Sequence, residues 1–435
     1  MISWQEEGFH KKREFACCWL FNIGIEDRWF TNHFKIRNRE EEKTVQHMEE
    51  ILLLLSNSED IVLLRKRPHP EFLERMRELG FQIPQILCPE KEDLSCTITE
   101  LVLEDAALIA KIKEAAQKKN LFLMPYGVTE KEEELGKVCG LKIKGSPAVV
   151  AKRTNNKLYA KELVEKLALP QPEGTVCTCL EEIPDAWNQL HRTFERVVIK
   201  RPYGASGQGL YRIENQQQLE RALYALRRSQ GQERGWIAEG WYEERQDLNA
   251  QMYLHEDGTV EIFSIKEQLI KNTVYQGSFF PVSLPGQIIS EYKEYMKTVG
   301  KELIREGVRG IVGIDSILTG NEFFPVIDIN VRFTLSTYLS VLPFLFTDRY
   351  FLAVYYRVLL TEKTGYDALQ QRAVQTGIAF DPDKKEGVFF YNRACVEKGV
   401  AGEIGRLFVV MVAKSRSTLA KLQLQMDKLL EGGLV

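Results

Sequence analysis

The stretch GIDSILTGNEFFPVIDIN, residues 313–330, has the pattern of two β-strands joined by a Gly-Asn turn at 320–321. Asp315 lies in the first strand, and Asp328 and Asn330 lie in the second. Residues two apart in a strand point to the same face, so Asp328 and Asn330 project together. The turn folds the strand of Asp315 back beside them. The three side chains offer hard oxygen ligands, which suit Mg²⁺ bound by one or two carboxylates and phosphate oxygens.

The alternative for these polar side chains is simple exposure to solvent at a sheet edge. The second strand argues against it, because its other residues are Val326, Ile327, Ile329 and Val331. An acid within such an apolar strand normally needs a partner, since burying an unpaired charge is costly. The pattern therefore favours a metal site.

A second stretch, VVIKRPYGASGQGL at 197–210, combines a β-branched run, Lys200 and a glycine-rich loop from Gly204 to Gly209. Glycines let backbone N–H groups approach a polyphosphate closely, and the lysine adds positive charge. The loop lacks the Lys-Ser/Thr ending of a Walker A loop and the glycine order of the dinucleotide fingerprint. By itself it is equally compatible with a structural hairpin that carries a surface lysine.

Composition places the chain among ordinary globular proteins. Its 435 residues are enough for two or three domains, and 44% of them are hydrophobic. The net charge of −3 argues against a nucleic-acid partner. The charged start, MISWQEEGFHKKREF, is unlike a secretory signal, and the apolar stretch 344–360 is interrupted by Asp348 and Arg349, so we expect no membrane partner and a cytoplasmic location.

The eight cysteines form no CxxC pair, which favours reduced cysteines, although Cys177 and Cys179 could in principle hold a metal. The six histidines form no HxxxH or HxH pattern, so a histidine-ligated metal site is not expected. The chain also lacks the G-x-S-x-G motif of serine hydrolases.

Residues 1–144 alternate between strand-like and helix-like segments, which predicts a parallel sheet with helices on both faces. No G-x-G-x-x-G follows the first strand, so this is not a standard dinucleotide domain. The sequence GIEDRWF at 24–30 follows that strand. It is either a functional loop or a helix start with buried Trp29 and Phe30.

The rest of the chain has a different pattern. From Gly145 we expect a short helical segment, the glycine-loop strand, an amphipathic helix at 216–231 and long strands with a hairpin turn at 257–258. The segment from 346 onward mixes helices and strands. We therefore expect three domains, at 1–144, 145–345 and 346–435.

Taken in order, these motifs resemble the ATP-grasp superfamily of carboxylate ligases. The resemblance covers about 145–338 and rests on Asn156-Lys157, the glycine loop, a strand with Glu239, GIDS and VIDIN. It implies an ATP-grasp fold preceded by a Rossmann-like α/β pre-ATP-grasp domain, 1–144, and followed by an α+β C-terminal domain.

The resemblance also implies a nucleotide site. Lys157 and Lys200 match the two lysines that contact the phosphates, and the loop matches a flexible lid over them. Glu239 and Trp241 match the strand that meets adenine, and Asp247 is the candidate for the ribose. The residues that match the lid are Gly204, Ala205, Ser206, Gly207, Gln208 and Gly209.

Asp315, Asp328 and Asn330 match the magnesium ligands of the superfamily, for which Mn²⁺ is a possible substitute. The family usually has Glu where this chain has Asp328, a shorter side chain that affects the metal geometry. Arg332 matches an arginine that stabilises the transferring phosphoryl group or acyl phosphate, together with Lys200. Arg309 and Lys266 are further candidates for that role or for a substrate carboxylate, and each could equally be an ordinary surface cation.

The implied reaction is ATP- and Mg²⁺-dependent ligation of a carboxylate to an amine through an acyl phosphate, with release of ADP and phosphate. The sequence GIVGIDSILTGNEFFPVIDINVRFTLSTY, 310–338, is most similar to ligases of amino acids or short peptides, of the pheganomycin-biosynthesis type. The alternatives are a small-molecule kinase and a nucleotide-binding sensor. A homodimer is the default for such enzymes.

Overall fold

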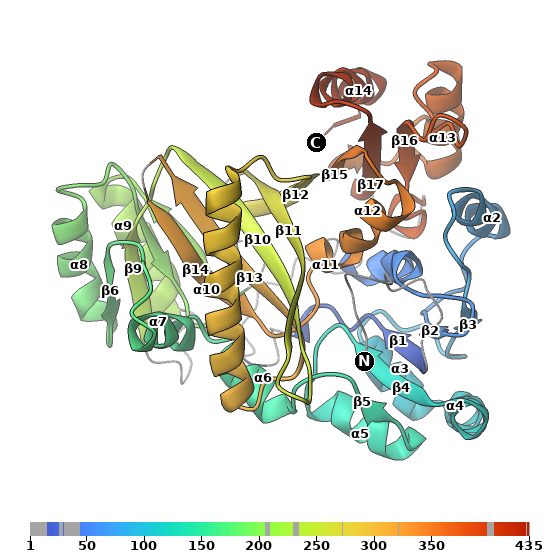
Figure 1. Cartoon of the computed structure of the whole chain (residues 1–435), viewed down its shortest axis with the longest axis horizontal. Helices are drawn as coiled ribbons and strands as arrows, with labels where there is room; N and C mark the ends of the chain where they lie inside the picture. The colour runs from blue at the N-terminus through green and yellow to red at the C-terminus, as the bar shows by residue number, and fades with distance from the viewer. Residues whose placement is uncertain are drawn as a thin grey trace.

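The computed structural model of the protein describes residues 15–25, 29, 44–204, 209–228, 235–271, 273–320, 322–397, 404–431 and 433–434. Within these residues the strands form sheets of five, four and eight strands. Figure 1 shows the four-stranded sheet at the left, the eight-stranded sheet from the centre to the upper right, and the five-stranded sheet at the lower right. We call them the small, large and parallel sheets.

The parallel sheet has the order β3-β2-β1-β4-β5, and all its pairs are parallel, as the alternating pattern predicts. Its strands are β1 (Ala16–Leu20), β2 (Ile61–Leu63), β3 (Gln85–Leu87), β4 (Leu121–Pro125) and β5 (Lys142–Ile143). Its helices are η2 (His47–Leu54), α2 (Pro70–Glu78), α3 (Ile98–Glu104), α4 (Ala106–Lys118) and α5 (Glu130–Cys139).

Helices cover both faces of the parallel sheet. Cys18 and Leu20 pack on one side with residues of α3, α4 and α5. Cys17 and Trp19 pack on the other side with η2 and α2. This division follows from the two-residue period of β1, because alternate side chains of a strand point to opposite faces. The two-sided α/β arrangement predicted from the sequence is confirmed.

The small sheet has the antiparallel order β6-β9-β7-β8. Its strands are β6 (Gly174–Cys177), β7 (Val197–Lys200), β8 (Leu210–Ile213) and β9 (Trp236–Gly240), and α8 (Ile183–Leu190) and α9 (Gln216–Arg228) pack against it. The helices α6 (Ala148–Thr154) and α7 (Lys157–Lys166) and the short η3 (Leu180–Glu182) complete this part. Leu219, Ala222 and Leu226 of α9 are buried, as its helical period predicts.

The large sheet has the order β14-β13-β10-β11-β12-β15-β17-β16, with antiparallel pairs. Its strands are β10 (Arg245–Leu254), β11 (Val260–Lys271), β12 (Val274–Phe280), β13 (Gly310–Thr319), β14 (Phe323–Asn330), β15 (Tyr350–Leu359), β16 (Gly387–Phe390) and β17 (Ile404–Ala413). Gly258 has a φ of +92° in the β10–β11 turn, which confirms the hairpin expected at 257–258.

One face of the large sheet is apolar and lies under α10 (Gly286–Arg305), which runs along it in Figure 1. The core between them includes Tyr292, Met296, Val299, Leu303, Leu248, Ala250, Met252, Val312 and Ile314. Because strand residues alternate, Asn249, Gln251 and Asp315 lie on the opposite face. That face carries the polar side chains described below.

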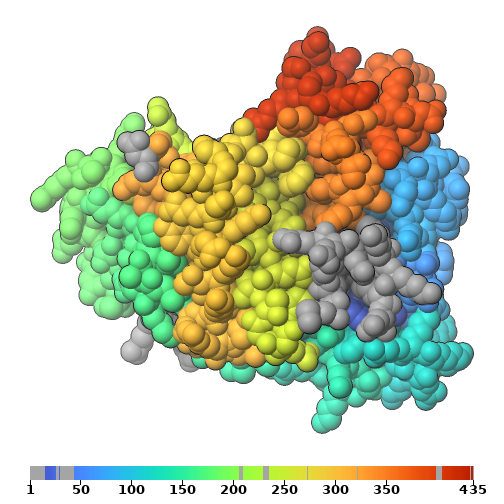
Figure 2. Space-filling model, viewed as in Figure 1, coloured from blue at the N-terminus to red at the C-terminus, as the bar shows by residue number. Residues whose placement is uncertain are grey.

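The large sheet continues past residue 345, because Phe280 of β12 pairs with Phe351 of β15. Beyond β14 lie α11 (Leu335–Tyr338), η4 (Leu339–Val341), α12 (Leu342–Leu345), α13 (Tyr366–Gln375), η5 (Ala394–Val396) and α14 (Arg416–Leu429). One hydrophobic cluster joins Trp19 of β1 with Phe389 of β16, and Figure 2 shows the C-terminal part directly above the N-terminal part. The domain limits given above stay a prediction.

No helix in the described part of the chain is both long and apolar enough to cross a membrane.

Candidate active site

The register of β13 and β14 places Asp315 directly opposite Asp328, and Gly313 opposite Asn330. The Asn330 Nδ2 donates a hydrogen bond to Asp315 Oδ2 at 3.2 Å. The structure therefore brings together the three side chains that the strand period predicts on one face. Asn321 of the connecting turn lies outside the described residues.

Two amide side chains hold the carboxylate of Asp315 in place. Asn249 Nδ2 and Gln268 Nε2 both donate to Asp315 Oδ1, at 2.8 and 3.0 Å. Burial and the neighbouring Asp328 carboxylate raise the pKa of Asp315 to about 6, against the effect of the amide donors and Lys157. Two carboxylates this close are stabilised by a cation between them.

This donor set fits Mg²⁺. It offers two carboxylates and an amide side chain on one face of a sheet, and Mg²⁺ binds through one or two carboxylates plus substrate phosphates. Among the described residues no group of three or more His, Cys, Asp or Glu side chains could hold a metal.

Lys157 is the first residue of α7 and forms an ion pair with Asp328. Its position is set by the helix start, where Asn156 Oδ1 accepts a hydrogen bond from Leu158 N at 2.9 Å. The backbone N–H of Lys157 donates to Pro202 O at 2.8 Å, in the segment that leaves β7. The helix start is thus joined to the segment that enters the glycine loop.

On the small sheet, Glu239 of β9 pairs with Val198 of β7. Lys200 is two residues after Val198 in β7, so Lys200 and Glu239 lie on the same face. Lys200 Nζ lies 2.5 Å from Glu239 Oε2. The ammonium of Lys161, which the sequence analysis did not select, lies 3.0 Å from Glu239 Oε1. Burial disfavours the ionised form of Glu239, but the two lysines outweigh it and hold its pKa below the usual value.

The structure also joins Trp241 and Asp247, through an arginine that the sequence analysis missed. The Arg245 guanidinium lies 3.7 Å from the centre of the Trp241 ring, and its Nε lies 3.2 Å from Asp247 Oδ2. Asp247 is opposite Gln268 of β11, on the face that carries Asn249. Burial raises the pKa of Asp247, and Arg245 partly offsets this.

Arg332 links this face to the parallel sheet. Its Nη2 donates to Asn330 Oδ1 at 2.8 Å, and its Nη1 donates to Tyr126 Oη at 2.8 Å. Tyr126 directly follows β4, at the carboxyl end of the parallel sheet, where open α/β sheets bind ligands. The arginine is only 8% exposed. It lies two residues past Asn330, the last residue of β14, and so is close enough for a cation to meet a phosphoryl group near these carboxylates.

A buried polar network continues along β10. Gln251 Nε2 donates to Asn249 Oδ1 at 2.6 Å and to Thr334 Oγ1 at 3.1 Å, and Thr337 Oγ1 donates to Gln251 Oε1 at 2.7 Å. The sequence analysis missed Asn249 and Gln251. Their signal was the alternation D-L-N-A-Q at 247–251, which places three polar side chains on one face of a buried strand.

The two ends of the glycine loop lie close together. Arg201 N donates to Gly209 O at 2.9 Å, and Gly209 has a φ of +79°, where a Cβ would come within 3.2 Å of Tyr203 O. The Trp29 ring lies 6.1 Å from the Tyr203 ring, so the segment after β1 reaches this loop. The predicted lid residues 205–208 lie outside the described residues, as do Phe30 and residues 26–28 of the GIEDRWF segment.

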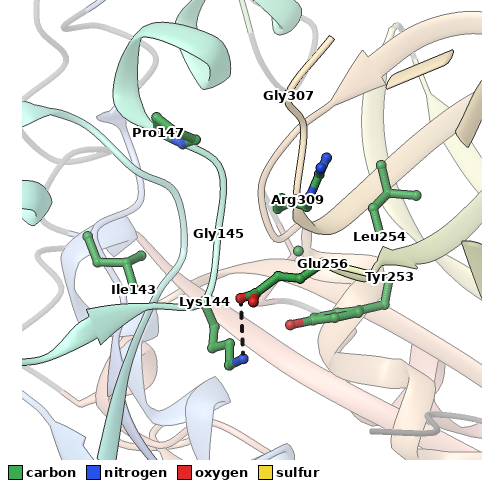
Figure 3. A pocket seen from close by; sticks show the side chains of 10 residues that line it. Ile143, Lys144, Gly145, Pro147, Tyr253, Leu254, Glu256, Gly307 and Arg309 are labelled. Carbon is green, nitrogen blue, oxygen red and sulfur yellow. Dashed lines mark ion pairs between the residues drawn. The ribbon is translucent and has the colours of Figure 1, made fainter. Parts of the chain in front are cut away.

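The structure does not bring Arg309 to this cluster. It precedes β13, and its Nη1 donates to the carbonyl of Ile304, in the last turn of α10, at 2.8 Å and to that of Val308, which follows the helix, at 2.7 Å. Orphan carbonyls at a helix C-terminus attract cations, so this contact is a helix cap. Arg309 lines a cavity of about 350 Å³, shown in Figure 3. Lys144 and Glu256 line the same cavity, with Lys144 Nζ 3.8 Å from Glu256 Oε1.

Lys266 is on the polar face but is not exposed. It pairs with Asn249 across β10 and β11, and its Nζ donates to Ser336 O at 2.9 Å and Ser340 Oγ at 2.7 Å. Burial lowers the pKa of Lys266 to about 7. The surface-cation alternative therefore does not apply to it.

Known families match three consecutive parts of the chain. A pre-ATP-grasp domain matches residues 48–141, an ATP-grasp domain matches 154–336, and a PGM1 C-terminal domain matches 368–424. Together with the site, these matches identify the class: the chain belongs to the ATP-grasp superfamily and is an ATP-dependent, ADP-forming ligase that uses ATP with Mg²⁺. The resemblance seen in the sequence is confirmed.

Among curated relatives, the chain is similar to the [butirosin acyl-carrier protein]–L-glutamate ligase of Niallia circulans. The two are 27% identical over 432 residues, which cover 94% of each. The L-propargylglycine–L-glutamate ligase of Streptantibioticus cattleyicolor is 24% identical over 255 residues, covering 54% of this chain and 52% of that one.

Solved structures support the fold. An ADP complex of N5-carboxyaminoimidazole ribonucleotide synthetase has a TM-score of 0.56 at 11% identity, covering 96% of this chain and 97% of that chain. The biotin carboxylase of Campylobacter jejuni has a TM-score of 0.58 at 14% identity, covering 90% of both. The arrangement of the three parts is therefore that of ATP-grasp enzymes.

Proposed function

We propose that this enzyme joins the carboxylate of an amino acid or short peptide to an amine, with L-glutamate as one of the two substrates. The observation that carries the proposal is the facing, partly buried pair of Asp315 and Asp328, with Lys157 bonded to Asp328 and Arg332 bonded to the neighbouring Asn330. Glutamate is suggested by both curated relatives, whose names contain it.

In the proposed reaction a carboxylate oxygen attacks the γ-phosphorus of ATP, and ADP leaves. The amine, in its neutral form, then attacks the acyl carbon. The bond from that carbon to the phosphate oxygen breaks, inorganic phosphate leaves, and the nitrogen loses a proton to give the amide. These are the steps of an ADP-forming ligation, and they require no covalent bond to the protein.

We assign the parts of the site as follows. Lys157 and Lys200 bind the phosphates of ATP, and Glu239, Trp241 and Asp247 surround its nucleoside. Asp315, Asp328 and Asn330 would hold Mg²⁺, which neutralises charge on the phosphates when it is bound. Arg332 stabilises charge on the transferred phosphoryl group, because a fixed guanidinium in a buried site acts without reorganisation.

The buried location supports this chemistry. Asn249 and Gln251 are 0% exposed, and Arg332 is 8% exposed. A site closed to water protects an acyl phosphate from hydrolysis and strengthens electrostatic contacts. We place the enzyme in the cytoplasm, where ATP is available, and expect a homodimer, which light scattering would test.

The test is a reaction of purified protein with ATP, Mg²⁺ and L-glutamate against a panel of amines. The panel contains free amino acids, dipeptides and an acyl-carrier protein loaded with an amino acid. We expect ADP, phosphate and a product heavier by one ligated unit, formed only when both substrates are present. AMP with pyrophosphate, or ADP with a stable phosphorylated acceptor, would overturn the proposal.

A further inference from the structure

Lys161 of α7 lies one helical turn after Lys157, so both side chains project from the same face of the helix. Lys157 pairs with Asp328 of the large sheet, and Lys161 pairs with Glu239 of the small sheet. The helix therefore presents one ammonium group to an acid of each sheet. Lys161 also donates to Pro172 O at 3.3 Å, which fixes its direction.

The Glu239 carboxylate is shared between two amines. Its Oε1 lies 3.0 Å from Lys161 Nζ, and its Oε2 lies 2.5 Å from Lys200 Nζ. All three residues are at least nine-tenths buried. We call Lys161, Glu239 and Lys200 the lysine triad. It carries one more ammonium than carboxylate, in a place where charge is weakly screened.

A single buried Lys–Glu pair is neutral, and each partner holds the other strongly because separation would leave an unpaired buried charge. In such a pair Lys200 would be bound to Glu239 and would have little charge to offer a phosphate. The second lysine changes this balance. It neutralises Glu239 from the other oxygen, so the excess positive charge remains in the triad.

We propose that Lys161 is a positioning residue of the nucleotide site, which keeps the ammonium of Lys200 available to the phosphates of ATP by sharing Glu239. The inference rests on the proposed nucleotide site and goes beyond it, because Lys161 acts through Glu239 and not by contact with the nucleotide. A merely structural Lys161 would tie α7 to β9 with no effect on phosphate affinity.

The experiment measures the dissociation constant of Mg-ATP by calorimetry, without other substrates, for four variants. Lys161→Met removes the charge but keeps the apolar stem, and Lys161→Arg keeps the charge. Lys166→Met is the matched control, because Lys166 lies on the same helix and is half exposed, pairing with Glu302. The double variant Lys161→Met/Glu239→Gln removes one charge of each sign. Thermal unfolding confirms that each variant is folded.

We expect Lys161→Met to weaken Mg-ATP binding about tenfold, as loss of a charged hydrogen-bond partner does. Lys161→Arg should stay close to the wild type, and Lys166→Met should be unchanged. The double variant should bind more tightly than Lys161→Met, because removing the carboxylate frees Lys200 again. A structural role cannot produce this rescue.

Two results would overturn the inference: Lys161→Met binding Mg-ATP as tightly as the wild type, or a double variant no tighter than Lys161→Met. These outcomes are separate from the proposed ligation. A wild type that binds Mg-ATP but forms no amide contradicts the proposed function and leaves the triad argument intact. A wild type that forms amide while Lys161→Met binds normally contradicts the triad argument alone.

Discussion

The large sheet and the small sheet each carry a cluster of charged side chains, partly buried on the large sheet and buried on the small one, and the two clusters differ in the sign of the charge that predominates. On the large sheet Asp328 faces Asp315 and forms an ion pair with Lys157, whereas Arg332 bonds to Asn330 and Tyr126, so two carboxylates lie around one ion-paired lysine. On the small sheet Lys161 and Lys200 share Glu239, so ammonium groups are in excess. Mg-ATP carries complementary charges: its metal ion is positive, like the partner that a carboxylate cluster needs, and its phosphate oxygens are negative, like the partner that an ammonium cluster needs.

Each sheet is therefore suited to a different part of the substrate. The carboxylate cluster would attract Mg²⁺ and disfavour bare phosphate, whereas the lysine triad would attract phosphate with or without a metal. α7 contributes a lysine to each cluster, so it joins them. Variants on the two sides should therefore differ in how their effects depend on Mg²⁺.

The largest effect is expected for Asp328→Ala on the carboxylate side. Turnover should fall by about 10³-fold, because an electrostatic group at the reacting phosphate is lost. Binding of metal-free ATP should be kept or improved. The control is Glu322→Ala, an exposed acid at the end of the same hairpin. Turnover of Asp328→Ala within threefold of the wild type would remove Asp328 from the site.

On the lysine side, Lys200→Met should weaken ATP binding by roughly tenfold to a hundredfold, since a charged contact to phosphate is lost. Unlike the effect of Asp328→Ala, this loss should be the same with and without Mg²⁺. Calorimetry at several Mg²⁺ concentrations measures the ATP dissociation constant of each variant with and without the metal. A loss that disappears when Mg²⁺ is removed would contradict the division between the two clusters.

Lys266 provides a smaller test, on stability. Within the described residues its ammonium bonds to serine oxygens and not to a carboxylate, and burial lowers its pKa to about 7. Between pH 7 and 10 the unfolded chain therefore binds the proton that the folded chain has lost. The free energy of unfolding should rise with pH in that window, by up to about 1.4 kcal/mol per pH unit relative to Lys266→Met.

Urea unfolding at pH 7, 8, 9 and 10 measures the difference in free energy of unfolding between the wild type and Lys266→Met. The contributions of the other titrating groups cancel in that difference. A constant difference across the window would mean that Lys266 keeps its proton in the folded state.

The smallest effect on activity is expected for Arg309→Gln. The guanidinium caps α10, so we expect a loss of stability of about 1 kcal/mol and turnover within twofold of the wild type. Thermal unfolding and steady-state kinetics measure the two. A large loss of turnover without loss of stability would return Arg309 to the candidate catalytic residues.

Local patterns predicted those features that depend on short spacings. The two-residue period of a strand was enough to place Asp328 beside Asn330, and the turn placed Asp315 opposite them. The order of five short motifs indicated the ATP-grasp fold. The α/β alternation of the first part predicted the parallel sheet, because crossover helices are what parallel strands require.

Features that depend on contacts between distant segments were not predictable in this way. Arg309 is a cation near the motif in sequence, but its guanidinium bonds to the carbonyl of Ile304 in the last turn of α10 and to that of Val308. Nothing in the local sequence distinguishes Lys161 from other helical lysines, because its partner Glu239 lies in β9, far away in the chain. The pairing of β12 with β15, which extends the large sheet past residue 345, leaves no local signal.

The most direct test of the acyl-phosphate mechanism follows the oxygen atoms of the substrate carboxylate. L-glutamate or another carboxylate substrate found in the panel is labelled with ¹⁸O in its reacting carboxylate, and the released phosphate is analysed by mass spectrometry. An acyl-phosphate mechanism predicts that one labelled oxygen moves into inorganic phosphate in each turnover, because the carboxylate oxygen that attacks ATP leaves with the phosphoryl group. Phosphate without label, formed together with the amide, would contradict the acyl-phosphate mechanism.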